Sequence, residues 1–150
     1  MGVTFNDLDP LALARLGRDS VTQAFEIDGE PAWRQAEAAA LEQALQGAGV
    51  LALGGGTPTA PGAAARIRAA QASGCVRVAL LHPGEAELVR RLRSGRGDRP
   101  RLDADDAAEV ARLSIERLPL YRSMADAVID TRADESACVG RLCALVTGGR

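Results

Sequence analysis

Apolar and polar residues follow two different periods along this chain, and these periods predict strands and helices in turn. Short apolar runs at 50–53, 75–81 and 127–131 are typical of strands buried on both faces, and residues 3–5 predict a further short strand. Between them, apolar residues recur at every third or fourth position, which predicts helices. The helices are expected at 10–16, 21–25, 31–46, 61–73, 85–93, 106–124 and 136–146. This alternation predicts an α/β fold, with a parallel sheet covered by helices on both faces, as one domain of residues 1–150.

Turn residues predict where several of these elements begin and end. Asp9 is the expected N-cap of the first helix, because Pro10 suits a first helical turn. Gly17 is expected to break that helix, and the Asp-Gly-Glu-Pro stretch at 28–31 predicts a turn. Residues 93–106 combine glycine, proline and charged residues, so we expect a mobile loop there.

The composition limits the kinds of partner that this chain can have. Its formal net charge of −2 provides no electrostatic basis for binding nucleic acid or an anionic membrane. No apolar run approaches the roughly 20 residues of a membrane-spanning helix, and no signal peptide opens the chain. A cytoplasmic location is therefore expected. All 18 basic residues are arginines, so no residue can act as a phosphate-binding lysine.

Three consecutive glycines stand at the end of one predicted strand. In open α/β sheets, ligands bind at the carboxyl ends of the strands, and glycine lets a ligand approach the backbone closely. A tight structural turn explains such a run equally well when it is taken alone. The residues concerned are Gly54, Gly55 and Gly56, which follow the predicted strand at 50–53 and precede a Thr-Pro-Thr turn.

Four further motifs surround the glycines in a fixed order. They are Asp7-Leu8-Asp9, Trp33-Arg34-x-x-Glu37, Arg99-Pro100-Arg101-Leu102, and Arg117-x-Pro119-Leu120-Tyr121 followed by Ala125-Asp126. Together with the glycines, this set resembles the shikimate kinase family. The resemblance covers residues 3–146. It implies a three-layer P-loop kinase-like fold and the transfer of the γ-phosphoryl group of ATP to shikimate, with Mg²⁺.

The resemblance also implies roles for residues around the substrate. Arg34 and Arg117 match positions that bind the shikimate carboxylate, and arginine suits a carboxylate because its planar fork binds both oxygens. Glu37 would orient Arg34. Asp9 matches the residue that accepts hydrogen bonds from the substrate hydroxyls, and it is the catalytic candidate that aligns or deprotonates the attacking hydroxyl. The backbone amides of residues 54–56 would line the substrate.

Two residues are implied on the nucleotide side. Asp7 matches an acidic residue beside the magnesium ion. Arg99 matches a lid arginine that reaches the transferring phosphates and contributes to catalysis, in a lid loop at about 93–106. Arg101 departs from the leucine that the family has at this position.

Each assignment has an alternative based on ordinary structure. Arg34 and Glu37 could form an i,i+3 ion pair on a solvated helix face, and Arg117 could be an exposed helix charge. Asp7 and Asp9 could reflect the preference for acids at helix N-termini. The aromatic side chains Phe25 and Trp33 could form either the wall of the substrate pocket or plain core.

The nucleotide-binding half of the family pattern is absent from this sequence. The sequence contains no Gly-x-x-x-x-Gly-Lys-Ser/Thr phosphate-binding loop. In the family, that loop follows the central strand of a sheet with the order 2-3-1-4-5. Without this strand, the strands at 3–6 and 50–53 lose their neighbour towards those at 76–81 and 127–131. We therefore expect Met1 to be an internal methionine of a longer enzyme, unless the protein has lost its nucleotide half.

Two functions of different classes follow. The first is an N-terminally truncated shikimate kinase, which is expected to be inactive without its P-loop and whose partners would be shikimate and ATP, with the protein as a monomer. The second is a non-catalytic kinase-like protein that binds a small carboxylate or a partner. A related small-metabolite kinase, such as gluconate kinase, fits less well because of the Arg-x-Pro-Leu-Tyr segment that begins at Arg117.

Overall fold

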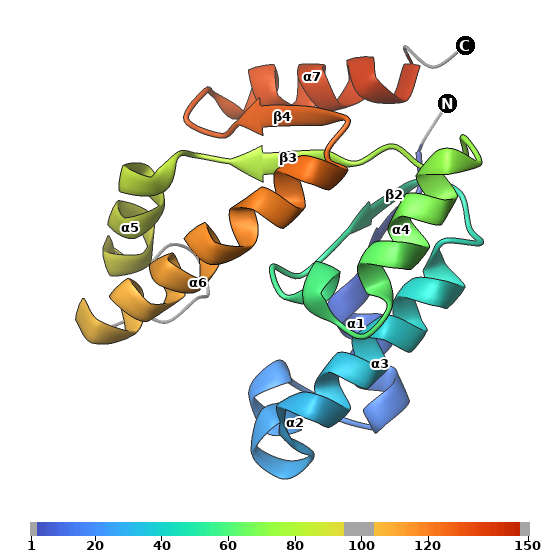
Figure 1. The fold of residues 1–150 in the computed structure, drawn as a ribbon, viewed down its shortest axis with the longest axis vertical. Helices are drawn as coiled ribbons and strands as arrows, with labels where there is room; N and C mark the ends of the chain where they lie inside the picture. The colour runs from blue at the N-terminus through green and yellow to red at the C-terminus, as the bar shows by residue number, and fades with distance from the viewer. Residues whose placement is uncertain (1–2, 95–103, 148–150) are drawn as a thin grey trace. The chain divides into compact units, whose positions relative to one another are not determined.

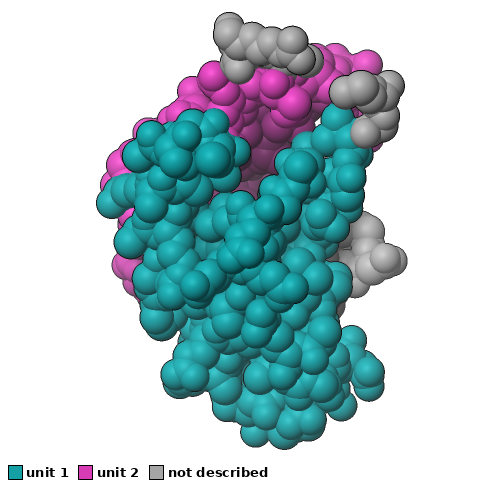
Figure 2. All heavy atoms as spheres, turned by 90° about the vertical axis from the view of Figure 1, so that its right-hand side faces the viewer, with its two compact units in different colours: residues 1–76 teal, residues 77–150 magenta. Residues whose placement is uncertain are grey.

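The chain forms two compact units in the computed structural model, which describes residues 3–94 and 104–147. The first unit comprises residues 1–76 and the second residues 77–150 (Figure 2). Each unit contains one pair of parallel strands with its own helices (Figure 1). The assignment of the whole chain to a single domain stays a prediction.

The first unit follows the predicted alternation of strands and helices closely. Its two strands pair in parallel, with Asn6 opposite Leu51. Its elements are β1 (Phe5–Asp7), α1 (Leu8–Leu16), α2 (Val21–Ile27), α3 (Gly29–Ala44), β2 (Val50–Ala52), the 3-10 helix η1 (Thr57–Thr59) and α4 (Ala63–Ala72).

Helix α1 begins at Leu8, two residues before the start that its sequence pattern predicted. Its N-cap is Asp7, whose Oδ1 accepts a hydrogen bond from the backbone N–H of Asp9 at 3.0 Å. The prediction of Asp9 as the N-cap is therefore wrong: Asp9 lies inside the first turn, together with Pro10. The predicted break at Gly17 is confirmed, since this glycine has a φ of 64° and its N–H caps the helix.

The prediction of a turn at 28–31 is also wrong, because α3 already begins at Gly29. Pro31 fits the first turn of α3, where its missing N–H needs no partner. Arg18 holds the start of this helix in place by binding both carboxylate oxygens of Asp28, at 2.7 and 2.9 Å. This contact spans ten residues of sequence, so local turn signals do not report it.

The core of the first unit lies where α1 and α2 pack against α3, with α4 alongside (Figure 1). Alanines line much of this contact and let the helices approach closely. Trp33 has the largest side chain in this core, and only 2% of the residue is exposed. The other buried apolar residues are Leu8, Ala12, Ala24, Ala36, Ala38, Ala40, Leu41, Ala60, Ala63 and Ile67.

The second unit contains the remaining strand pair, in which His82 lies opposite Asp130. Helix α7 packs on β4, and α5 packs against α6 (Figure 1). The elements are β3 (Ala79–His82), α5 (Glu85–Ser94), α6 (Ala104–Met124), β4 (Ala127–Asp130) and α7 (Glu135–Thr147). Helices α5 and α6 extend into the two ends of the predicted loop at 93–106. The rest of that predicted loop, which includes Arg99, lies outside the described residues.

Among the described residues, the strands form two separate two-stranded sheets, β1-β2 and β3-β4. This division agrees with the pairs expected for a sheet that lacks its central strand. The prediction that these strands are buried on both faces is wrong, since Val50, Leu81 and Val128 are exposed. An apolar run indicates what a strand can bury, but burial also requires a neighbour on each face. Within residues 3–94 and 104–147, no helix combines the length and the apolar character that crossing a membrane requires.

Candidate functional site

Three polar side chains converge on Gly54, just beyond the carboxyl end of β2. They belong to Asp9 on α1, Glu37 on α3 and Thr57 at the start of η1. A Cβ atom added to Gly54 would lie 3.2 Å from Asp9 Oδ1, and 3.4 Å from both Glu37 Oε1 and Thr57 Oγ1. Because β1 and β2 are parallel, the segments that follow them meet at one edge of the sheet. The structure therefore brings Asp9 to the glycine run, and the family resemblance implied that both contact the substrate.

Arg34 lies directly against the backbone of Gly56. A Cβ at Gly56 would overlap the Arg34 guanidinium, with Cζ only 2.5 Å away. The guanidinium is held by two carboxylates on its own helix. Arg34 Nη1 donates to Glu37 Oε2 at 2.6 Å, while Nε and Nη2 both donate to Glu30 Oε1, at 3.2 and 3.0 Å. The contact between Arg34 and Glu37 that the resemblance implied is thus present.

The Glu37 carboxylate is buried, and both of its oxygens accept a hydrogen bond. Only 1% of Glu37 is exposed. Its Oε1 accepts a hydrogen bond from Thr57 Oγ1 at 2.8 Å, and its Oε2 accepts one from Arg34. A buried carboxylate is costly unless it is paired and hydrogen-bonded. The alternative of an ion pair on a solvated helix face is therefore wrong for Arg34 and Glu37.

The charge on Arg34 is stabilised although the side chain is partly buried. Burial alone would lower the pKa of the guanidinium, but its hydrogen bonds to Glu37 and Glu30 outweigh burial and raise that pKa. Arg34 therefore remains a cation at any physiological pH. The Arg34 guanidinium is therefore a cation of fixed orientation that lies beside the glycine backbone at Gly56.

The two aromatic residues near the arginine have different environments. Trp33 belongs to the core, whereas Phe25 is partly exposed. Their ring centroids are 6.1 Å apart, and Arg34 Cζ lies 6.0 Å from the centroid of the Phe25 ring. This separation is at the limit of a cation–π interaction. The structure therefore identifies Trp33 as core and leaves Phe25 as the aromatic side chain that borders the arginine.

Two residues of this site were missed by sequence reasoning. Glu30 shares the Arg34 guanidinium with Glu37, and its spacing of four residues from Arg34 is the available signal. Thr57 is completely buried at 0% exposure, yet the apolar residues around it in the sequence follow neither helical nor strand periodicity. Its position directly after the third glycine is the only local signal, and that signal does not predict burial.

The other predicted site residues have environments of their own. Asp7 is exposed at the end of β1, and its Oδ1 caps α1. Within the part of the chain that the structure describes, no group of three or more His, Cys, Asp or Glu residues is arranged to hold a metal ion. Arg117 is half-buried on α6, in the second unit. Arg99 is among the residues that are not described.

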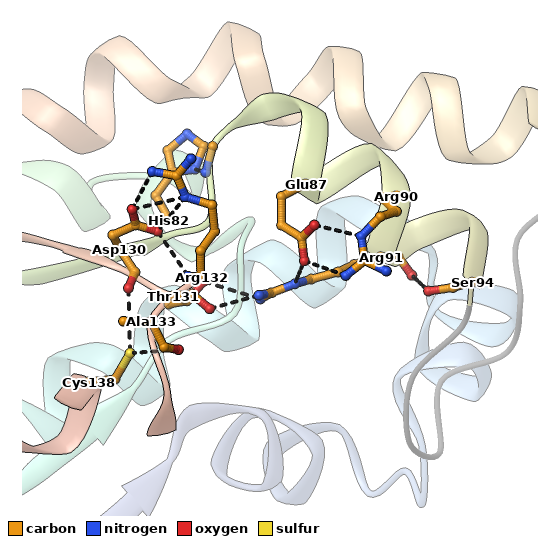
Figure 3. Close-up of polar contacts among 11 residues, drawn as sticks. His82, Glu87, Arg90, Arg91, Ser94, Asp130, Thr131, Arg132, Ala133 and Cys138 are labelled. Carbon is orange, nitrogen blue, oxygen red and sulfur yellow. Dashed lines mark hydrogen bonds and ion pairs between the residues drawn. The ribbon is translucent and has the colours of Figure 1, made fainter. Parts of the chain in front are cut away.

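A second polar cluster lies at the start of α5 in the second unit (Figure 3). Glu87 accepts hydrogen bonds from Arg90 Nε at 2.6 Å and from Arg91 Nε at 2.7 Å. These two arginines lower the pKa of Glu87 to about 2. Arg91 Nη2 also donates to the backbone carbonyl of Thr131 at 2.7 Å. This cluster therefore fastens α5 to the end of β4.

Shikimate kinases are among the solved structures that this chain resembles. The chain is similar to shikimate kinase from Bacteroides thetaiotaomicron, with a TM-score of 0.72 and 25% identity, over 96% of this chain and 84% of that one. It is also similar to shikimate kinase from Acinetobacter baumannii in complex with shikimate. That match has a TM-score of 0.73 and 25% identity, over 99% of this chain and 81% of that one. These matches show the α/β fold of P-loop kinases of this type.

The sequence comparison agrees with the fold. The family model described as shikimate kinase matches residues 1–146. Shikimate kinase of Mycobacterium bovis BCG Pasteur is 39% identical over 143 residues, which are 94% of this chain and 77% of the relative. The chain therefore belongs to the shikimate kinase family.

Proposed function

We propose that this chain binds shikimate at the carboxyl ends of β1 and β2, and that it serves the ATP-dependent phosphorylation of shikimate to shikimate 3-phosphate. The observation that carries the proposal is the convergence of Asp9, Glu37 and Thr57 on Gly54, with Arg34 against Gly56. Membership of the shikimate kinase family supports the choice of ligand.

The chemistry of this site suits a small hydroxylated carboxylate. Shikimate has one carboxylate and three hydroxyls. Arg34 is a planar cation able to bind a carboxylate with two parallel hydrogen bonds, and Arg117 is proposed as a second one. Asp9 is an acceptor for substrate hydroxyls. A Cβ at Gly55 would meet no heavy atom within 4 Å, so there is open space above the middle of the glycine run.

The nucleotide side of the proposal rests on fewer residues. ATP is the proposed co-substrate, and Arg99 is proposed to contact its phosphates. Asp7 fits the chemistry of Mg²⁺, which binds to one or two carboxylates and otherwise to waters and substrate phosphates. The residues present do not fit a phosphate cradle, because the sequence contains neither a P-loop nor any lysine. We therefore derive no catalytic step through the nucleotide.

Titration calorimetry with shikimate tests the binding site directly. The 150-residue polypeptide is expected to bind shikimate at one site. Shikimate methyl ester, which lacks the carboxylate charge, is the matched control and is expected to bind much more weakly. An absence of shikimate binding, or equal affinity for the acid and its ester, would contradict the proposal.

The polypeptide of this sequence is expected not to turn over ATP at a useful rate. Catalysis of phosphoryl transfer depends largely on electrostatic stabilisation of the transferring phosphate, to which the lysine and backbone of a P-loop contribute much. An assay that couples ADP release to NADH oxidation, with and without shikimate, measures this. Robust shikimate-dependent ADP release from the purified polypeptide would show that the prediction is wrong.

The same assay separates the two proposed classes of function. A chimera that carries a lysine-containing P-loop segment before Met1 is expected to release ADP when shikimate is added. A folded chimera that binds both shikimate and ATP without releasing ADP would instead favour the alternative, a non-catalytic protein that binds a small carboxylate.

Gly56→Ala is expected to weaken shikimate binding by about 10- to 100-fold. The new methyl group would displace the Arg34 guanidinium, and losing a charge-assisted hydrogen bond costs about 1.5–3 kcal/mol. The backbone of Gly56 has a φ of −96°, which alanine adopts without strain. Calorimetric titration with shikimate measures the change. The control is Gly140→Ala in α7, where a Cβ meets nothing within 4 Å and binding should not change.

A further inference from the structure

We propose that Thr57 is a positioning residue, which fixes the buried Glu37 carboxylate so that Glu37 presents Arg34 to the substrate carboxylate. The proposal rests on the proposed function and deepens it. It concerns a threonine to which neither the family motifs nor the sequence pattern assigns a role.

The hydroxyl of Thr57 is held firmly by its surroundings. The residue is completely buried and opens η1, immediately after the three glycines. Its backbone N–H donates to the carbonyl of Gly54 at 3.0 Å, which ties it to the glycine run. A β-branched side chain in such a turn has little rotamer freedom. The hydroxyl that donates to Glu37 Oε1 at 2.8 Å is therefore a fixed donor.

Glu37 connects Thr57 to Arg34, because its carboxylate accepts a hydrogen bond from each of them. Within the described part of the chain, each carboxylate oxygen accepts a hydrogen bond from one side chain: Oε1 from Thr57 and Oε2 from Arg34. The last torsion of a glutamate is broad, so a single donor does not define the orientation of the carboxylate plane. With both donors present, the plane is set and so is the direction of the Arg34 guanidinium. Loss of the hydroxyl would leave Oε1 buried without this donor, which favours rotation of the carboxylate.

Glu30 is a second carboxylate that accepts hydrogen bonds from Arg34 and competes with Glu37 for its guanidinium. The Glu30 side chain is 58% exposed, whereas that of Glu37 is 2% exposed. When the hydrogen bond between Arg34 and Glu37 weakens, the Arg34 guanidinium can turn towards Glu30 and solvent, away from Gly56. Thr57 therefore acts on substrate affinity through Arg34, without touching the substrate itself.

The test compares Thr57→Val with Thr57→Ser in shikimate titrations of the 150-residue polypeptide. Valine keeps the shape but lacks the hydroxyl, and it is expected to weaken shikimate binding about 5- to 30-fold. Serine restores the donor and is expected to bind within about threefold of the wild type. Thr22→Val, at an exposed position of α2, is the matched control and should leave affinity unchanged. If Thr57→Val does not fold, Thr57→Ala replaces it with the same expected loss.

A double substitution shows whether Thr57→Val lowers shikimate affinity through Arg34 or through a general effect on the structure. In the Arg34→Ala background, Thr57→Val is expected to cause little further loss, since the residue through which it acts is already absent. A full additional loss, or wild-type affinity of the single Thr57→Val variant, would overturn the proposal.

Failure of the proposed function has a different signature. If the wild-type polypeptide binds no shikimate, the proposed function is wrong, and a crystal structure of Thr57→Val then decides the positioning role by itself. A displaced Arg34 guanidinium would support the role, whereas an Arg34 still bound to Glu37 above Gly56 would overturn it.

Discussion

Arg34→Ala is expected to weaken shikimate binding by about 30- to 1000-fold, which corresponds to about 2–4 kcal/mol. The loss is large because a bidentate, charge-assisted contact to the substrate carboxylate disappears. Arg34→Lys should recover only part of it, since an ammonium group lacks the planar fork. Calorimetric titration of each variant with shikimate measures the dissociation constants.

The control for this experiment is Arg15→Ala. Arg15 is an exposed arginine on α1 that donates to Gln43 at 2.9 Å, and its removal should not change shikimate affinity. Arg34→Ala also leaves the buried Glu37 without its cation, so the thermal unfolding midpoint is recorded for every variant. The double variant Arg34→Ala/Glu37→Gln removes that uncompensated charge. Wild-type affinity of a folded Arg34→Ala variant would show that the assignment of Arg34 is wrong.

Asp9→Asn, in the chimera that carries a P-loop segment, is expected to lower kcat by about 10²- to 10⁴-fold. Asparagine keeps the size of the side chain and one acceptor oxygen, but it lacks the basicity that assists the attacking hydroxyl. Shikimate binding should change much less than kcat. Steady-state kinetics of ADP release, together with calorimetric titration, measure the two effects separately.

Two other aspartates provide the comparison for Asp9. Asp19→Asn changes an exposed residue between α1 and α2, and it should leave kcat unchanged. Asp7→Asn should alter the magnesium dependence of the rate, because a carboxylate near the metal acts through the ion. A loss in kcat of less than about threefold for Asp9→Asn would exclude general-base catalysis by this residue.

The elements with the clearest periodicity were predicted well. Helix α3 and strand β4 lie close to their expected positions, because the apolar residues that pack against the core repeat at the spacing of the element. The start of α3 was not predicted. Its Asp-Gly-Glu-Pro sequence is typical of a turn, but the contact between Arg18 and Asp28 stabilises a helix there.

The candidate site was predicted in outline. The resemblance to the shikimate kinase family implied that the glycine run, Asp9 and Arg34 lie together at the substrate. The structure supplies the contacts that connect them. Glu30 and Thr57 were missed, since neither belongs to a motif and the Thr57–Glu37 contact joins residues that are 20 positions apart.

By itself, the sequence determined the order of helices and strands and the family motifs. It also determined the chemical nature of the site, in which every cation is an arginine, two residues are acids and the backbone is glycine. Only the tertiary structure decided that Glu37 is buried, that Thr57 satisfies it and that Trp33 is core. The physical reason is that propensity and periodicity depend on neighbours in sequence, whereas the burial of a polar group depends on side chains that distant segments bring to it.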